Sequence, residues 1–157
     1  MTSTLPILPL DWTPAVSKVE VAAAEVPWSE MNLRSCFEAD YQNFGIWSHD
    51  ARELYAFILV HQPLADEWTI INIAVVPQAQ RRGYAEALVR YVVAKAARQP
   101  AKVFLEVRSS NNAARKLYQK VGFQEIGLRK NYYPTLSGTK EDAIVMLWNK
   151  PTEIQSV

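Results

Sequence analysis

Residues 70–86 read IINIAVVPQAQRRGYAE, and their pattern is the most informative about the architecture of the chain. Its first part, 70–76, is apolar on both alternating faces apart from Asn72, which predicts a strand buried on both sides near the centre of a sheet. A turn containing two arginines and Gly83 follows. From about 82 to 98, apolar residues then recur at helical spacing. The stretch therefore predicts a buried strand, a tight turn and a long helix.

The turn from Gln80 to Ala85 is suited to binding a phosphate group. Backbone N–H groups at the start of a helix lack partners and carry the positive end of the helix dipole, so they can hold a pyrophosphate. Gly83 lets the backbone approach the anion, and Ala85 lets the helix pack closely on the strand. Arg81 and Arg82 add full positive charges. An ordinary helix start is the alternative, but the position directly after a buried strand favours the phosphate site.

The rest of the chain alternates helices and strands. Asp11 and Ser29 are placed to cap two helices, and Ser110 or Asn111 can cap another that Gly122 ends. Periodicity predicts helices over 13–24, 30–38 and 82–98, and a fourth helix that follows the cap at Ser110 or Asn111 and ends at 121. It predicts strands over 5–8, 41–47, 54–61, 68–76, 102–108, 124–128 and 143–148. The fold class that follows is α/β, a sheet flanked by helices.

The composition is that of a globular protein with one core. The chain has 157 residues, of which 49% are hydrophobic and 21% charged, and this length leaves no room for a second domain. We expect a single domain over 1–157, with a folded core of about 5–149 and a short C-terminal tail. No apolar run reaches membrane-spanning length, so we expect a cytoplasmic protein without a membrane anchor. One cysteine and two histidines are too few for an internal disulfide or a zinc site.

The charge is unevenly distributed although the net charge is only +1. Residues 1–80 hold ten acidic and three basic residues, whereas residues 81–130 hold twelve basic and three acidic residues. The basic part suggests contact with an anion, and the acidic part tolerates or prefers cations. A solvated surface with scattered charges is the alternative.

The turn from Gln80 to Ala85 also matches the Q/R-x-x-G-x-G/A signature of the GNAT superfamily of N-acetyltransferases. Further segments resemble the RimI-like branch of that superfamily, which comprises bacterial N-terminal protein acetyltransferases. These segments are Pro27–Ser29, Asn72–Val75, Leu105–Arg108, Ser110–Asn111, Leu117–Tyr118, Val121–Phe123, Asn131–Pro134 and Glu141–Ala143. The resemblance runs from Pro27 to about Trp148. It implies a single GNAT-like domain whose mixed, mostly antiparallel sheet is flanked by helices.

The resemblance implies an acetyl-CoA-dependent N-acetyltransferase that needs no metal. Its implied acceptor is the N-terminal α-amine of a protein, a small-subunit ribosomal protein. Glu106, a carboxylate in an otherwise apolar strand, is implied as the general base, because an ammonium has no lone pair with which to attack a thioester. Tyr118 is implied as the general acid that protonates the leaving thiolate. A paired glutamate and a core tyrosine are the structural alternatives for these two residues.

Binding residues are implied in the same way. The acetyl and pantetheine arm is assigned to Ile73, Ala74 and Val75, with a strand distortion at Val75 that aims a backbone N–H at the thioester carbonyl. Further cofactor contacts are assigned to Gln80, Arg81, Arg82, Gly83, Tyr84, Ala85, Glu86 and Asn111. Asn111 could instead cap its helix. Trp28, Tyr132 and Tyr133 are the expected walls of the acceptor site.

Two other functions stay open on the sequence. The same fold could acetylate a lysine side chain or a small amine. A non-catalytic module could bind nucleic acid through the basic stretch 81–130. Few aromatic residues interleave with the basic ones there, and the phosphate-binding turn accounts for several of them. We therefore expect no direct nucleic-acid binding.

Overall fold

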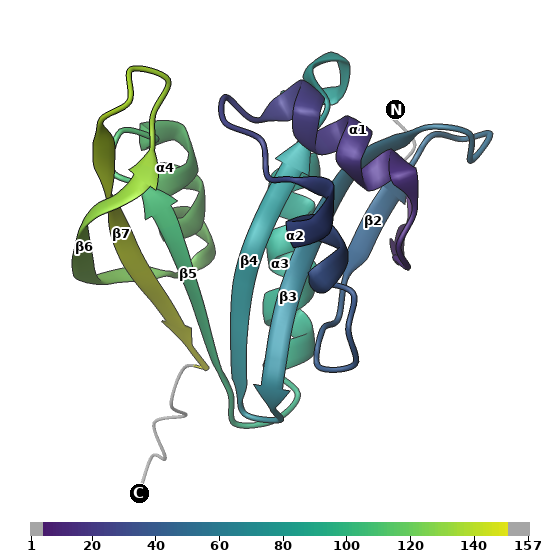
Figure 1. Cartoon of the computed structure of the whole chain (residues 1–157). Helices are drawn as coiled ribbons and strands as arrows, with labels where there is room; N and C mark the ends of the chain where they lie inside the picture. The colour runs from purple at the N-terminus through teal and green to yellow at the C-terminus, as the bar shows by residue number, and fades with distance from the viewer. Residues whose placement is uncertain (1–4, 151–157) are drawn as a thin grey trace, which may run out of the picture.

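The computed structural model describes residues 5–150, in which seven strands form one sheet of order β1-β2-β3-β4-β5-β7-β6 (Figure 1). The strands are β1 (Ile7–Pro9), β2 (Phe44–Trp47), β3 (Leu54–Leu64), β4 (Glu67–Val75), β5 (Lys102–Arg108), β6 (Gln124–Pro134) and β7 (Lys140–Asn149). The helices are α1 (Pro14–Ala23), α2 (Glu30–Ser35), the short 3-10 helix η1 (Pro77–Ala79), α3 (Tyr84–Ala96) and α4 (Asn112–Val121). The expected C-terminal tail lies outside the described residues.

The sheet is mixed and mostly antiparallel, as predicted. Among the strands of the described chain only β4 and β5 pair in parallel, and every other neighbouring pair is antiparallel. The predicted buried strand is β4, which lies in the middle of the sheet. α3 connects it to β5, as a parallel pair requires.

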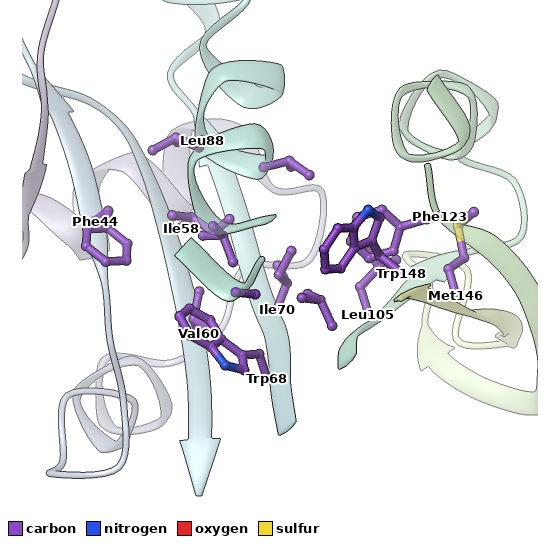
Figure 2. Packing of buried hydrophobic residues seen from close by; sticks show 14 of the residues in the cluster. Phe44, Ile58, Val60, Trp68, Ile70, Leu88, Leu105, Phe123, Met146 and Trp148 are labelled. Atoms are coloured by element: carbon purple, nitrogen blue, oxygen red, sulfur yellow. The ribbon is translucent and has the colours of Figure 1, made fainter. Parts of the chain in front are cut away.

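Helices cover both faces of the sheet, so two hydrophobic clusters form. One face packs against α3 and α4, and Figure 2 shows part of this cluster, from Phe44, Ile58 and Leu88 across Ile70 to Leu105 and Met146. The other face packs against α1 and α2 and forms the second cluster. Its buried side chains are Leu10, Val16, Val19, Leu33, Cys36, Leu54, Phe57, Leu59, Ala74, Val76 and Ala79. Burial on both faces explains the continuous apolar runs of β3 and β4.

The pairing of β4 with β5 stops part-way along both strands. Its last pair is Ile70 with Leu105, after which β4 stays on β3 and β5 stays on β7. Ile71 is an extra residue in the β3–β4 ladder, because the register shifts between the pairs Leu59–Asn72 and Val60–Ile70. The two strands consequently diverge, as Figure 1 shows between the arrows of β4 and β5.

Several helix boundaries differ from the predicted ones. Thr13, not Asp11, caps α1, because its side chain accepts a hydrogen bond from the Ala15 N–H. Ser29 caps α2 as predicted, but that helix ends at Ser35 rather than at 38. α3 begins at Tyr84 rather than at 82, because Gly83 before it is left-handed.

β6 is longer than the predicted 124–128 because a bulge hides its continuation. Its pairing with β7 is interrupted between Arg129 and Tyr133 and resumes up to Pro134. Within the bulge Asn131 has a φ of 53°, and its N–H donates to the Asp142 carboxylate at 2.9 Å. A bulge breaks the two-residue alternation on which strand prediction depends.

Candidate active site

A cleft of about 690 Å³ opens where β4 and β5 diverge. Residues Asn72 to Ala74 of β4 line one side, and Glu106 to Arg108 of β5 line the other. The α1–α2 loop with Trp28 and the Tyr118 side of α4 complete its walls, together with Tyr133 of β6. Segments far apart in the sequence thus meet in one cavity, and the cavity follows directly from the early end of the β4–β5 pairing.

Glu106 lies on the cleft face of β5. Alternation buries Val103, Leu105 and Val107 on the opposite face, as predicted, and leaves the Glu106 side chain 22% exposed. Its Oε1 lies 2.9 Å from Nε of Arg129 on β6. The guanidinium of Arg129 also stands over the Tyr132 ring, 5.4 Å from its centroid. Tyr132 is therefore next to Glu106 without being part of the cleft lining.

Tyr118 projects from α4 into the same cleft. Its ring packs 6.0 Å from that of Phe123, and the side chain is partly buried among the apolar residues of α4. Burial raises the pKa of Tyr118 to about 12. The phenol is therefore fully protonated at neutral pH and can donate a proton. In this position Tyr118 can be a core aromatic residue and a proton donor at the same time.

Tyr133 and the end of β6 are held by Arg108. The Arg108 guanidinium donates to the Pro134 carbonyl at 2.8 Å and to the Glu141 carboxylate at 3.1 Å, and it stacks 4.6 Å from the Tyr133 ring centroid. Burial raises the pKa of Tyr133 well above its usual value, so this phenol is also neutral. Arg108 was part of the family resemblance, but its role in fixing the Tyr133 wall becomes visible only in the folded sheet, where the ends of β6 and β7 reach the end of β5.

On the opposite side, a buried carboxylate holds the α1–α2 loop. Glu20 of α1 is 2% exposed; its Oε2 accepts the Trp28 N–H at 2.9 Å, and its Oε1 accepts the Asn72 side-chain N–H at 3.1 Å. The sequence singled out Asn72 as the polar exception in an apolar strand, but it gave no sign that Glu20 is its partner. Glu20 lines the cleft and is absent from the predicted site residues.

The turn before α3 has the backbone that a phosphate site requires. Arg81 and Gly83 are both left-handed, with φ of 64° and 82°, and no side chain caps α3. A Cβ added to Gly83 would meet no atom within 4 Å, so the space beside this backbone is open. The Gln80 side chain donates to the Val75 carbonyl at 3.1 Å and the Arg82 side chain to the Gln78 carbonyl at 3.1 Å, which fixes the loop.

The remaining predicted cofactor residues have different surroundings. Ile73, Ala74 and Asn111 line the cleft, whereas Val75 does not. The prediction of a strand distortion at Val75 is wrong, because the register shift in β4 falls at Ile71. The Asn111 side chain caps α4 by accepting the Ala114 N–H at 3.1 Å. Tyr84 stacks 6.2 Å from the Tyr55 ring, and Ala85 is partly buried in the first turn of α3.

Glu86 is committed to an ion-pair network between helices. Its carboxylate accepts from Lys120 of α4 at 2.9 Å and from Arg90 at 3.0 Å, and the Lys120 hydrogen bond lowers the pKa of Glu86. A carboxylate repels an anion, so Glu86 can contribute only its backbone N–H to an anion site at the start of α3. Together with Arg108–Glu141, Arg115–Glu125 and Arg129–Glu106, this network pairs many of the basic residues between 81 and 130.

Comparison with known proteins agrees with this geometry. The profile of the Acetyltransferase (GNAT) family matches residues 8–123. The chain belongs to the GNAT family of acetyltransferases. It is 42% identical over 130 residues to a [ribosomal protein bS18]-alanine N-acetyltransferase of Haemophilus ducreyi, covering 82% of this chain and 88% of that protein. The enzyme of the same name from Escherichia coli K12 is 40% identical over 134 residues, covering 85% and 88%.

Solved structures of GNAT enzymes agree with the fold. The crystal structure of the ribosomal-protein-S18-alanine N-acetyltransferase from Escherichia coli matches with a TM-score of 0.87 and 35% identity, covering 98% of this chain and 99% of that one. Arabidopsis thaliana NAA60 in complex with acetyl-CoA matches with a TM-score of 0.81 at 18% identity, covering 93% and 98%, a likeness of fold alone.

The predicted resemblance, fold class and activity class are confirmed: this GNAT enzyme is an acetyl-CoA-dependent N-acetyltransferase. The alternative of a non-catalytic module that binds nucleic acid is therefore wrong, because the chain belongs to a family of enzymes. No helix within residues 5–150 is long and apolar enough to cross a membrane. In the same residues, His, Cys, Asp and Glu side chains do not gather in groups of three that could hold a metal ion.

Proposed function

We propose that this enzyme transfers an acetyl group to the N-terminal alanine of a ribosomal protein, the counterpart of bS18. The names of the relatives at 40–42% identity support this acceptor. A ribosomal protein as the acceptor also supports a cytoplasmic location. No membrane or nucleic acid takes part in the proposed reaction.

The single observation that carries the proposal is the shared cleft of Glu106 and Tyr118. The two residues come from different elements, β5 and α4, and line one cavity with Trp28 and Tyr133. A cleft between diverging strands lets two substrates meet, one entering from the α3 side and the other from the α1–α2 side. Glu106 supplies a proton acceptor there and Tyr118 a proton donor, which are the two groups that acyl transfer to an amine requires.

The proposed reaction uses these groups in sequence. Glu106 takes a proton from the ammonium of the acceptor, directly or through water, and the free amine attacks the thioester carbonyl carbon. The new C–N bond forms, the C–S bond breaks, and the leaving thiolate takes the phenolic proton of Tyr118. The attacking nitrogen then gives up its second proton, which returns Tyr118 to the neutral phenol, and Glu106 releases the first proton to solvent. Because burial raises the pKa of Tyr118 to about 12, its proton is present at the start of each cycle over the whole neutral range.

The residues around the turn fit the phosphates of acetyl-CoA. The uncapped N-terminus of α3 presents unpaired N–H groups, and the open space beside Gly83 gives a phosphate access to them. Arg81 and Arg82 are exposed beside this turn and add positive charge. Ile73 and Ala74, which line the cleft, are suited to contact the apolar part of the pantetheine arm.

A comparison of three peptides tests the acceptor. The first peptide begins with a free alanine and carries one internal lysine. The second is the same peptide with its alanine acetylated. The third keeps the free alanine but has arginine in place of the lysine. We expect acetylation of the first and third peptides and none of the second, measured by mass spectrometry with acetyl-CoA present. Acetylation of the blocked peptide at lysine would instead assign the enzyme to side-chain acetylation.

A further inference from the structure

Glu20 is a buried carboxylate that the proposed chemistry does not use. It is 2% exposed, and its hydrogen bonds go to the Trp28 backbone N–H and the Asn72 side chain, both neutral groups. The ion pairs of the described chain do not include it. Burying a carboxyl group without a cation partner is costly, even with two good donors. An acidic side chain at this position therefore calls for an explanation other than stability.

The two donors belong to different walls of the cleft. Trp28 lies in the loop between α1 and α2, and Asn72 lies on β4 just past the point where β5 leaves it. Glu20, Trp28 and Asn72 all line the cavity. One side chain thus connects the loop on the acceptor side to the strand that carries Ile73 and Ala74.

Helix α1 does not need Glu20 to stay in place. Val16 and Val19 of the same helix are 0% and 2% exposed in the cluster on that face of the sheet, so apolar burial already anchors α1. The two Glu20 hydrogen bonds have a different effect: they hold the backbone at Trp28 in a fixed position relative to Asn72 of β4. These bonds act on the Trp28 backbone, whereas the Trp28 ring packs on the apolar cluster of that face.

We propose that Glu20 is a positioning residue of the acceptor site, which fastens the Trp28 loop to Asn72 and so sets the peptide-binding wall of the cleft. The inference rests on the proposed function, since it concerns the peptide substrate. It predicts an effect on the peptide KM that is separate from acetyl-CoA binding and from folding.

Two substitutions at Glu20 separate positioning from charge. Glu20→Ala removes both acceptors, and we expect the peptide KM to rise about tenfold or more, as losing hydrogen bonds to a charged group implies, with the acetyl-CoA KM unchanged. Glu20→Gln keeps both bonds: its Oε1 accepts the Trp28 N–H, and its amide donates to Asn72 once the Asn72 amide turns over. We expect Gln to restore the peptide KM to within about threefold of wild type.

Hydrogen exchange of the Trp28 segment gives a second readout. The Trp28 N–H should exchange faster in Glu20→Ala and at the wild-type rate in Glu20→Gln. Lys18→Ala, an exposed change on the same helix, is the control and should alter neither KM nor exchange. If Glu20→Ala does not fold, Asn72→Ala replaces it, because it breaks one bond of the pair and should raise the peptide KM in the same direction but less.

The outcomes distinguish this inference from the proposed function. A folded Glu20→Ala enzyme with a wild-type peptide KM overturns the inference, and so does a Glu20→Gln enzyme as impaired as Glu20→Ala. Either result leaves N-terminal acetylation by the wild-type enzyme intact. If the wild-type enzyme acetylates no free N-terminus, the proposed function fails first, and the positioning role fails with it.

Discussion

The two sides of the cleft are built differently. On the N-terminal side, β3 and β4 are buried on both faces between α1, α2 and α3, and apolar packing dominates. On the C-terminal side, β6 is exposed along most of its length, and ion pairs tie β5, β6, β7 and α4 together. The N-terminal side carries the Gly83 turn and the Trp28 loop, and the C-terminal side carries Glu106 and Tyr118. We therefore propose that the apolar-packed side holds acetyl-CoA and the Trp28 loop, whereas the ion-paired side performs proton transfer and adds the Tyr133 wall.

The largest expected effect tests the C-terminal side as the place of chemistry. Glu106→Gln keeps the shape and removes the proposed base, so we expect kcat to fall about 10²–10⁴-fold with little change in acetyl-CoA affinity. Steady-state kinetics and calorimetry measure the two quantities. The matched control is Glu125→Gln, which also loses an arginine partner on this side but lies outside the cleft lining. Near-normal turnover in Glu106→Gln would make the carboxylate structural.

The next prediction sharpens the packing contrast. Phe57 of β3 is 0% exposed, so Phe57→Ala should lower the free energy of unfolding by about 3–5 kcal/mol through lost burial and a new cavity. Leu128 of β6 is 51% exposed, and Leu128→Ala should cost less than about 1 kcal/mol. Urea unfolding of both variants checks this. Similar losses for the two would show that β6 is more deeply packed than its exposure indicates.

Tyr118→Phe should lower kcat about 10²-fold while the melting temperature barely changes, because the ring and its packing are kept. Burial raises the pKa of Tyr118 to about 12, so the phenol is protonated below that pH. The ratio of wild-type to variant kcat should therefore stay constant from about pH 7 to about pH 10. Tyr91→Phe, on α3 and outside the cleft, is the control. A fall in stability with unchanged kcat would identify Tyr118 as a core aromatic only.

A smaller effect tests binding on the N-terminal side. Gly83→Val places a branched side chain at a φ of 82°, beside the backbone that the phosphates approach, and strain of about 1–2 kcal/mol adds to the obstruction. We expect the acetyl-CoA Kd to rise about tenfold. Gly138→Val is matched in strain, with a φ of 85° and nothing within 4 Å, but lies in the β6–β7 turn. Equal acetyl-CoA affinities in the two variants would remove the turn from the site.

The smallest expected effect concerns acceptor charge. Glu20, Glu25 and Glu106 line the cleft, and its one lining arginine, Arg108, is paired with Glu141. Peptides with basic residues at positions two to four should therefore show a higher kcat/KM than acidic ones, and the preference should shrink with salt, since screening acts over roughly 8 Å. Kinetics at low and high salt measure it. Equal values at both salt concentrations would leave the carboxylates as solubility charges.

The sequence predicted the binding side in more detail than the catalytic side. The strand, the glycine turn and the helix of residues 70–98 lie next to one another in the chain, so local pattern was sufficient to place them. Glu106 was also predictable, because alternation in β5 puts it opposite Val103, Leu105 and Val107. The second half of β6 was not predictable from the sequence, because the bulge at Asn131 interrupts the alternation of side chains along the strand.

Neighbouring residues encode the element types, the glycine turn before α3, the cap at Ser29, a cap at Ser110 or Asn111, and the family motif, and the sequence was sufficient for these. Tertiary structure decided the rest, since it joins residues whose distance in the chain carries no signal. The divergence of β4 from β5 creates the cleft, and Glu20 meets Asn72 across 52 positions. The physical reason is that propensity and periodicity act within a turn or a strand, whereas cleft walls form only when separate elements pack.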